Sequence, residues 1–264
     1  MEYSKTNIGF STGSIALGDF KAGISFLKEK NIKVIELSAL RENELINFMD
    51  EIDSLDIDFF DYVSFHAPSK LVKFDEPQFV NILKQIAKKN WLIIVHPDII
   101  NNFSLWNSLG RLLCIENMDK RKNSGRTVAD LEFIFEQLPE ASFCFDVAHA
   151  RQIDSTMSEA KLMINKFKNR LKQIHLSDVN SQSKHESLSL ESLLSYSKLF
   201  EMLPSGIPII LESPVEREKI EHEIQVASLI FKPHTLINFI KPYSKYSNYF
   251  KSYIESYNKE DIKL

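Results

Sequence analysis

The chain alternates eight short apolar runs with segments of helical periodicity, and this alternation constrains its fold more than any other feature. Apolar runs without polar–apolar alternation are typical of strands buried on both faces of a parallel sheet. Eight strand–helix units close a (β/α)8 barrel, and 264 residues is a usual length for one such domain. The runs begin at Asn7, Ile32, Tyr62, Trp91, Arg111, Ser142, Lys172 and Pro208. The sequence therefore predicts a single α/β TIM barrel over residues 1–234.

The segments between the apolar runs carry helix signals. Apolar residues from Phe79 to Ala87 recur at spacings of three and four, which predicts an amphipathic helix. Thr127 followed by Asp130 resembles a capping box that opens another helix, and Pro139 ends it. An open, doubly wound sheet is the alternative architecture. It is disfavoured because the turn at residues 9–14 lacks the glycine pattern of a phosphate-binding turn.

Residues 235–264 form a tail of different character. Its aromatic residues are spaced by three and four, which predicts one extra C-terminal amphipathic helix. They are Tyr243, Tyr246, Phe250, Tyr253 and Tyr257. The aromatic stripe has two interpretations: it packs on the outer wall of the barrel, or it forms the contact of a homodimer.

Composition excludes several classes of partner. With 32 Lys and Arg against 36 Asp and Glu, the formal net charge is −4, which gives no overall attraction to nucleic acid or an anionic membrane. No apolar run approaches the length of a transmembrane helix, and the N-terminus lacks a signal-peptide pattern. Cys114 and Cys144 both lie in strand-like runs, so we expect free buried thiols. These features predict a cytoplasmic protein without a membrane partner.

Nearly every predicted strand ends on a potential metal ligand. The carboxyl ends of parallel barrel strands meet at one mouth, so these side chains should share a small volume. Unpaired carboxylates gathered there would repel one another, and a cation removes that cost. The residues are Glu36, His66, His96, Glu116, Asp146, His149, His175, Asp178, His185 and Glu212. Carboxylates combined with imidazoles predict a site for Zn²⁺, Mn²⁺ or a related divalent ion.

Two other interpretations of this mouth are weaker. A Ser-His-Asp hydrolase needs a nucleophile on a strained turn, and the sequence has no GxSxG motif. A catalytically inactive binding barrel would have lost several ligands, whereas this chain keeps nearly all of them.

The ordered motifs at the strand ends resemble those of the xylose-isomerase-like barrel superfamily. That superfamily includes sugar phosphate isomerases and epimerases and the endonuclease IV group of DNA repair enzymes. The motifs are HAP (66–68), VHP (95–97), IEN (115–117), FDVAH (145–149), HLSD (175–178), a downstream His185 and LES (211–213). The resemblance covers residues 7–231 and leaves out the tail.

In the isomerase and epimerase branch, the resemblance implies one metal ion held by Glu116, Asp146, His175 and Glu212. The two metal-bound glutamates, Glu116 and Glu212, would move a proton between carbons of the substrate. The ion would polarise a sugar carbonyl and stabilise the enediolate.

In the endonuclease IV branch, the resemblance implies three zinc ions and nine ligands. Eight positions match, namely the four residues above together with His66, His96, His149 and His185. The ninth ligand is an aspartate two residues before His185, where this chain has Ser183, and Asp178 or Glu186 could substitute. The features that grip DNA are poorly matched, since SKLV follows the HAP motif and the loop after the seventh strand lacks the expected glycines.

Basic residues follow several strand ends, including Lys120, Arg121, Lys122 and Arg126 in the loop after Glu116. They form either a solvated face or a phosphate-binding patch, in which arginine would bind phosphate through paired hydrogen bonds. The candidates for binding a substrate or its phosphate are His66, His96, Lys120, Arg121, Arg126 and Arg151.

The four-ligand set is complete and the three-zinc set is not, so the sequence favours a metal-dependent isomerase or epimerase of a sugar or sugar phosphate. Its catalytic candidates are Glu116, Glu212 and His149. One Zn, Mn or Mg ion is expected, and the substrate is predicted to be a small phosphorylated molecule rather than DNA. The alternative is a two- or three-zinc phosphoester hydrolase that acts on abasic-site DNA or a small phosphodiester.

Overall fold

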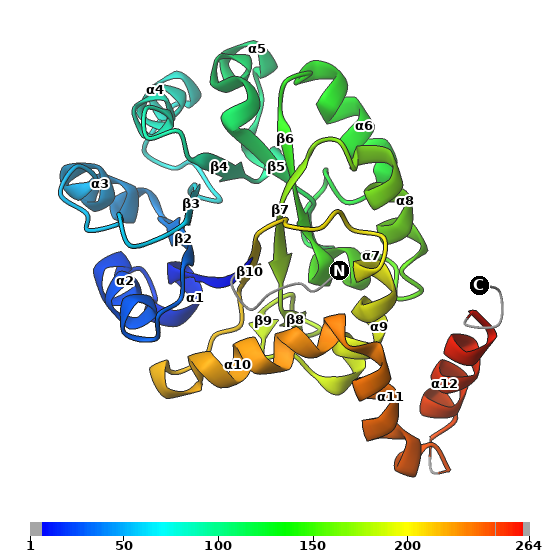
Figure 1. Ribbon diagram of the computed structural model, residues 1–264. Helices are drawn as coiled ribbons and strands as arrows, with labels where there is room; N and C mark the ends of the chain where they lie inside the picture. The colour runs from blue at the N-terminus through cyan, green and yellow to red at the C-terminus, as the bar shows by residue number, and fades with distance from the viewer. Residues whose placement is uncertain (1–6, 246, 261–264) are drawn as a thin grey trace.

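The computed structural model describes residues 7–245 and 247–260 and contains the predicted closed barrel (Figure 1). Eight parallel strands follow one another around the barrel in the order β1-β10-β7-β6-β5-β4-β3-β2. They are β1 (Ile8–Ser11), β2 (Val34–Ser38), β3 (Tyr62–His66), β4 (Leu92–Val95), β5 (Leu113–Glu116), β6 (Ser142–Asp146), β7 (Leu171–Leu176) and β10 (Ile209–Leu211). Each of the eight predicted runs forms one of these strands, so the TIM barrel is confirmed and the open sheet is excluded.

Helices surround the barrel and connect its strands (Figure 1). They are α1 (Thr12–Ala16), α2 (Phe20–Glu29), α3 (Glu42–Glu51), α4 (Glu76–Ala87), α5 (Phe103–Trp106), α6 (Val128–Gln137), α7 (Val147–Ile153), α8 (Ser158–Phe167), α9 (Leu190–Phe200) and α10 (Ile220–Ala227). The predicted capping box is confirmed at the start of α6, where the Thr127 hydroxyl accepts the backbone N–H of Asp130 at 3.2 Å. The two-residue strands β8 (Asp178–Val179) and β9 (His185–Glu186) form a hairpin after β7.

Strand alternation separates an apolar outer face from a more polar interior. The residues under the helices, such as Phe65 and Phe145, belong to the main hydrophobic core. Ile94, Cys114 and Cys144 form a separate buried cluster, and both thiols are free, as predicted. A hydrogen bond crosses the barrel from the Tyr62 hydroxyl to the Gln173 side chain at 2.7 Å. Polar side chains from facing strands therefore meet inside the barrel.

The predicted extra C-terminal helix is confirmed, and it begins after Tyr243, the first residue of the predicted aromatic stripe. The structure has α11 (Pro233–Ile240), the 3-10 helix η6 (Lys241–Tyr243) and α12 (Asn248–Glu260). Tyr243 lies in η6, before α12 begins, and Tyr246 lies outside the described residues. Pro242 has no N–H with which to continue the hydrogen bonds of α11. The Ser247 hydroxyl accepts the N–H of Phe250 at 3.4 Å and caps the new helix.

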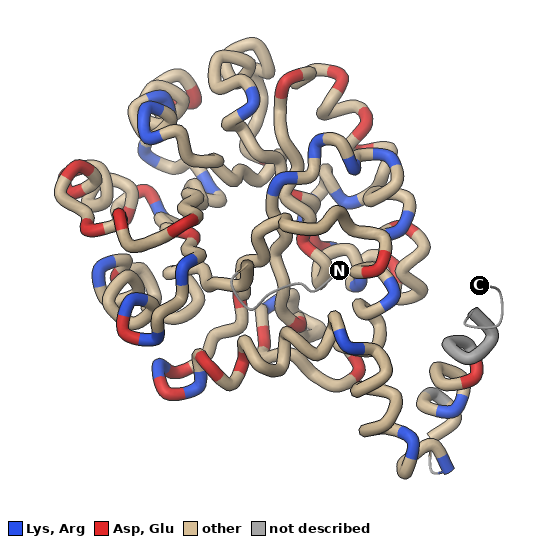
Figure 2. Tube along the Cα trace, viewed as in Figure 1, with Lys and Arg blue, Asp and Glu red and all other residues tan. Residues whose placement is uncertain are grey.

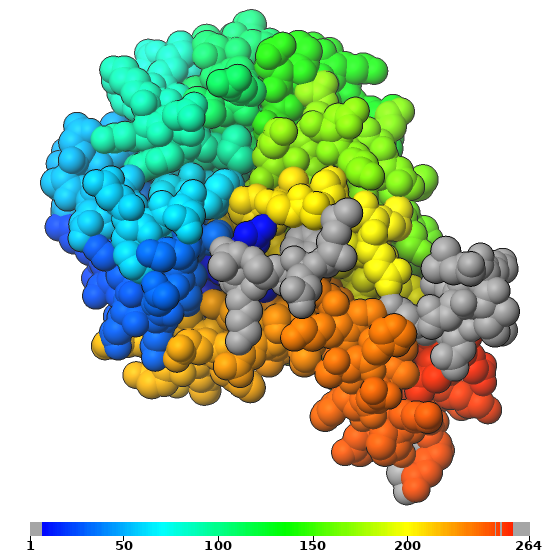
Figure 3. All heavy atoms as spheres, in the orientation of Figure 1, coloured from blue at the N-terminus to red at the C-terminus, as the bar shows by residue number. Residues whose placement is uncertain are grey.

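One aromatic residue of α12 packs on the barrel. Tyr253 is buried, and its hydroxyl lies 2.6 Å from the hydroxyl of Ser197 in α9. The side chain of Tyr257 is not among those described, and the homodimer contact stays a prediction. The orange and red segment stands out from the rounded body of the barrel (Figure 3).

Charged residues of both signs are interspersed around the ring of helices (Figure 2). Among the described residues, no helix is both long enough and apolar enough to cross a membrane.

Candidate metal centre

The eight predicted ligands come together at the carboxyl ends of the barrel strands. His66 ends β3, His96 follows β4, Glu116 ends β5, Asp146 ends β6, His149 lies in α7, His175 lies in β7, His185 lies in β9 and Glu212 follows β10. Seven of them form three overlapping groups in which the ligand atoms lie within 4.8 Å of one another. The groups are His66–Glu116–His175, Asp146–His149–His185 and Glu116–Asp146–His175–Glu212. The eighth, His96, lies beside Glu116.

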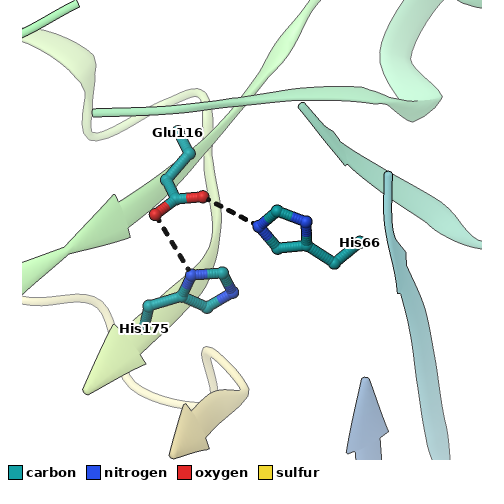
Figure 4. A group of neighbouring side chains, drawn as sticks. All are labelled: His66, Glu116 and His175. Carbon is teal, nitrogen blue, oxygen red and sulfur yellow. Dashed lines mark hydrogen bonds and ion pairs between the residues drawn. The ribbon is translucent and has the colours of Figure 1, made fainter. Parts of the chain in front are cut away.

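Glu116 is the centre of this cluster, and its two oxygens face different histidines. Oε2 lies 3.2 Å from His66 Nε2 and 3.3 Å from His96 Nε2. Oε1 lies 3.3 Å from His149 Nδ1 and 3.5 Å from His175 Nδ1. Figure 4 shows the carboxylate between the rings of His66 and His175. Glu116 belongs to two of the three ligand groups and could therefore take part in holding more than one ion.

The pKa values in the cluster show an excess of buried negative charge. Burial raises the pKa of Asp146 to about 6 and also raises the pKa of Glu212. Burial lowers the pKa of His149, but the nearby carboxylates of Asp146 and Glu116 outweigh it and raise the pKa to about 10. Asp146 and Glu212 thus tend to take up protons and His149 keeps its own, whereas the charge of His175 outweighs burial and lowers the pKa of Glu116. A bound cation would supply the missing positive charge in place of these protons.

Several buried polar atoms of the cluster have no hydrogen-bond partner among the described residues. Besides His96 Nδ1, four such atoms lie in the groups described above: Asp146 Oδ2, His149 Nε2, His175 Nδ1 and Glu212 Oε2. Buried polar atoms are rarely left without a partner, and those that are call for an explanation such as a bound ion. All four belong to predicted ligands, so the donor set fits a divalent metal.

Hydrogen bonds from behind orient the imidazole rings. His66 Nδ1 lies 2.9 Å from the carbonyl oxygen of Ala67, and His149 Nδ1 lies 3.0 Å from that of Asn117. A carbonyl oxygen only accepts, so each Nδ1 carries a proton, and each Nε2 is the nitrogen that would bind a metal in exchange for its own proton. Burial lowers the pKa of His185 to about 4, so its ring is neutral, the form that binds metals.

Glu36 supports the site from below rather than ending a strand at the mouth. The strand β2 continues to Ser38, and Glu36 is fully buried within it. Its Oε2 lies 2.9 Å from His175 Nε2 and accepts the amide N–H of Gln173 at 2.6 Å. Glu36 thereby leaves His175 Nδ1 free for a metal, in a carboxylate–histidine–metal arrangement. Gln173 was not predicted, although it lies two residues before His175 and so shares its face of β7.

The substitution Glu36→Gln is expected to weaken metal binding by about 10- to 100-fold, because a neutral amide orients His175 less strongly and lowers its basicity. Competition with a chelator of known affinity measures the effect, and circular dichroism checks the fold. Glu44→Gln, which removes a carboxylate of α3 that is only 11% exposed and is paired with Arg41, is the matched control. Equal metal affinity in Glu36→Gln and Glu44→Gln would show that Glu36 does not act on the site.

The basic residues at the mouth differ in how far they are already paired. Arg121 makes paired hydrogen bonds to Asp119, at 2.9 and 2.7 Å, and Arg151 binds Asp178 at 3.1 Å and Glu191 at 2.7 Å. The buried Nε of Arg126 has no hydrogen-bond partner among the described residues. Lys120 is exposed. Arg126 and Lys120 are therefore the better candidates for an added phosphate, and the phosphate site itself stays a prediction.

Neither suggested substitute for the missing aspartate joins the cluster. The side chain of Asp178 accepts hydrogen bonds from Arg151 at 3.1 Å and from Ser189 at 2.6 Å. Glu186 is exposed and binds Asn180 at 2.8 Å. Neither belongs to the three groups of ligand atoms described above.

Asp119, which the sequence reasoning missed, lies beside His149, although it too belongs to none of the three groups of ligand atoms. It is buried in the loop after β5, and its Oδ2 lies 3.8 Å from His149 Nε2. Burial raises the pKa of Asp119, but hydrogen bonds from Arg121 outweigh it and lower the pKa to about 2. The only sequence signal was an acidic residue three positions after Glu116.

Solved structures of low sequence identity share this barrel. A xylose isomerase domain containing protein from Salmonella typhimurium LT2 aligns with a TM-score of 0.60 and 12% identity, over 87% of this chain and 99% of the other. Endonuclease IV from Thermus thermophilus gives a TM-score of 0.55 and 14% identity, over 86% and 99%. SacUVDE gives 0.51 and 17%, over 82% and 85%. No protein-family model and no curated sequence matches the chain.

These similarities establish the class of the fold. The chain is a TIM barrel. It shares this barrel fold with a xylose isomerase domain containing protein and with endonuclease IV, the two kinds of protein that the motifs at the strand ends resemble.

Proposed function

We propose that this protein is a divalent-metal-dependent enzyme that hydrolyses a phosphoester at a centre of two or more metal ions. The observation that carries the proposal is the position of Glu116, whose Oε2 faces His66 and His96 while Oε1 faces His175. A single-metal site needs only the histidine or histidines that face one of the two oxygens. Carboxylates shared between neighbouring ligand groups are what a multi-metal site requires, and Asp146 is likewise shared by two groups.

Bound divalent ions would polarise the phosphoryl oxygen and lower the pKa of an attacking water. The residues of the chain fix the geometry for this chemistry. Glu116 belongs to two of the ligand groups and would connect them. Glu36 fixes the ring of His175. Asp146 uses Oδ1 to accept the N–H of His149 at 2.7 Å and keeps Oδ2 free for a ligand role.

The substrate we propose is a small phosphodiester or phosphomonoester. Lys120 and Arg126 lie in the loop that follows Glu116 and are the best placed of the predicted basic residues to bind its phosphate. Abasic-site DNA is not the favoured substrate, because the net charge of −4 offers no general attraction to a polyanion. It is included among the substrates to be tested.

Isomerisation or epimerisation of a sugar or sugar phosphate is the second candidate. The observation that favours it is the complete group of Glu116, Asp146, His175 and Glu212, which could hold one ion without the remaining histidines. Sequence reasoning preferred this function. We rank it second because it leaves His149 and His185 without a ligand role.

Metal content and substrate assays on one preparation test the proposal. Protein purified without chelator should contain two or three Zn or Mn ions per chain by inductively coupled plasma mass spectrometry. It should also cleave bis(p-nitrophenyl) phosphate, p-nitrophenyl phosphate or an abasic-site duplex. Glu212→Gln should abolish turnover with little loss of fold. One ion per chain together with conversion of aldose and ketose phosphates would overturn the proposal in favour of the isomerase.

A further inference from the structure

The ligand group that contains His149 and His185 lies where the endonuclease-type pattern expects an additional aspartate. At that position stands Ser183, whose hydroxyl donates to Gln152 Oε1 at 2.5 Å. Asp178 and Glu186 are engaged elsewhere, as described above. If the site holds several metal ions, as proposed, an acid from another part of the chain should take this place.

We propose that Asp119 supplies a carboxylate ligand of a metal ion that is also bound by His149. Asp119 Oδ2 lies 3.8 Å from His149 Nε2. Two ligand atoms that each lie about 2.1 Å from one zinc ion can be at most about 4.2 Å apart, so this separation fits a shared ion. It is too long for a direct hydrogen bond. The Asp119 side chain is only 2% exposed, so the approach is not a surface coincidence.

His149 independently points to a ligand at this place. Its Nδ1 is occupied by the carbonyl oxygen of Asn117, and its buried Nε2 has no hydrogen-bond partner among the described residues. The rings of His149 and His185 lie close, with centroids 5.4 Å apart. A cation between Asp119 Oδ2 and His149 Nε2 would satisfy the free nitrogen of His149.

The hydrogen bonds of Asp119 leave the necessary lone pair available. Oδ1 accepts the backbone N–H and the Nε–H of Arg121, at 2.7 and 2.9 Å. Oδ2 accepts one bond, from Arg121 Nη2 at 2.7 Å. A carboxylate oxygen has two lone pairs, so Oδ2 retains one for the side of His149. The paired contact with Arg121 also fixes the plane of the carboxylate.

The loop that carries Asp119 is fixed in position. The backbone N–H of Met118 donates to the carbonyl oxygen of Gly125 at 2.8 Å, which closes the loop on itself. Gly125 has φ of 75°, and a Cβ there would lie 2.6 Å from Pro97 Cγ, at the start of η2 (Pro97–Ile99). The loop therefore packs tightly on the segment that follows His96.

Gln152 ties this loop to the β8–β9 hairpin. Its Oε1 accepts the backbone N–H of Lys120 at 3.3 Å and the hydroxyl of Ser183 at 2.5 Å. Its Nε2 donates to the carbonyl oxygen of Asn180 at 3.0 Å. Asp119 and the hairpin that carries His185 are thus held together through one residue of α7.

Metal content of the full-length holoprotein tests this assignment without relying on activity. Asp119→Asn keeps the shape of the side chain and should lose about one Zn per chain, or bind its weakest ion at least about 10-fold less tightly. The controls Asp98→Asn, which removes the neighbouring acid that pairs with Lys122, and Asp178→Asn should retain the metal content of the unmodified chain. Unchanged content and affinity in Asp119→Asn, or a loss in Asp178→Asn instead, would overturn the assignment.

A spectroscopic measurement keeps the proposal testable if Asp119→Asn folds poorly. In Asp119→Cys loaded with Co²⁺, coordination by the new thiolate should give a sulfur-to-cobalt charge-transfer absorption in the near ultraviolet. The unmodified chain, whose thiols Cys114 and Cys144 are buried below the site, should not show it. A cobalt-loaded Asp119→Cys protein without this absorption would contradict coordination at position 119.

This inference and the proposed function fail in different ways. The metal count of the unmodified chain tests the multi-metal function, whereas the difference between that count and the count of Asp119→Asn tests Asp119. If the unmodified chain holds two ions and Asp119→Asn holds the same number, the proposed function stands and Asp119 is not a metal ligand. A one-ion chain rejects the function, and the absorption of the cobalt-loaded Asp119→Cys variant still decides whether that ion lies at Asp119.

Discussion

Glu116→Gln is expected to remove at least one metal ion per chain and to reduce turnover by more than about 100-fold. Loss of a residue that only orients a ligand already costs about 10- to 100-fold in metal affinity or activity, and Glu116 faces four imidazoles directly. The glutamine side chain carries no charge and offers only one oxygen to a metal, so it can bind an ion in at most one of the two ligand groups. Mass spectrometric metal analysis and assays on phosphoesters measure the two effects.

The matched control for Glu116→Gln is Glu186→Gln. Glu186 is an exposed carboxylate of β9 directly after His185, and its side chain binds only Asn180 among the contacts described above. This variant should keep its metal and at least half of its turnover. A Glu116→Gln protein that retains the full metal content would mean that Glu116 is not a ligand. The assignment of a bridging carboxylate would then be lost.

The fold was predictable because each barrel strand corresponds to a short, recognisable stretch of sequence. Each strand is covered by helices on one side and by the barrel interior on the other, so it reads as a short, mostly apolar run. The number of runs then predicted that the sheet closes on itself, since eight parallel strands form a barrel. The C-terminal helix was also predictable, but its first residue was not, because spacing alone does not show that Pro242 and Ser247 separate Tyr243 from the helix.

The candidate ligands were predictable because they lie at the ends of strands. The residues that were missed or misplaced do not lie there. Strand ends meet at one mouth whatever the loops do, so the sequence alone places His66, Glu116 and Asp146 together. The role of Glu36 depends on which strand face it occupies and how deep it lies in the barrel. The position of Asp119 depends on the path of a loop, which is set by the packing of Gly125 on Pro97. Such long-range contacts leave no periodic pattern.

Removal of bound metal by chelation is expected to lower the thermal midpoint of unfolding by about 5 to 16 °C. A ligand at 100 to 1,000 times its dissociation constant stabilises the folded state by about 2.7 to 4.1 kcal/mol. For a chain of this size, each kcal/mol shifts the midpoint by about 2 to 4 °C. The stabilisation is expected because Glu116, Asp146 and Glu212 are gathered with little exposure and, without a cation, are balanced only by protons and imidazoles.

Differential scanning calorimetry of the holoprotein, the chelated protein and the chelated protein reloaded with Zn²⁺ or Mn²⁺ measures this shift. Reloading should restore the midpoint, because the ligands stand on barrel strands and adjoining segments that are fixed by the surrounding fold. The Glu116→Gln variant should show a smaller difference between its loaded and chelated forms, since it retains fewer ions. If the midpoint of the unmodified chain is indifferent to chelation and reloading, the cluster is a hydrogen-bonded polar core rather than a metal site. Its imidazoles would then balance the carboxylates by protonation alone, as the raised pKa of His149 allows.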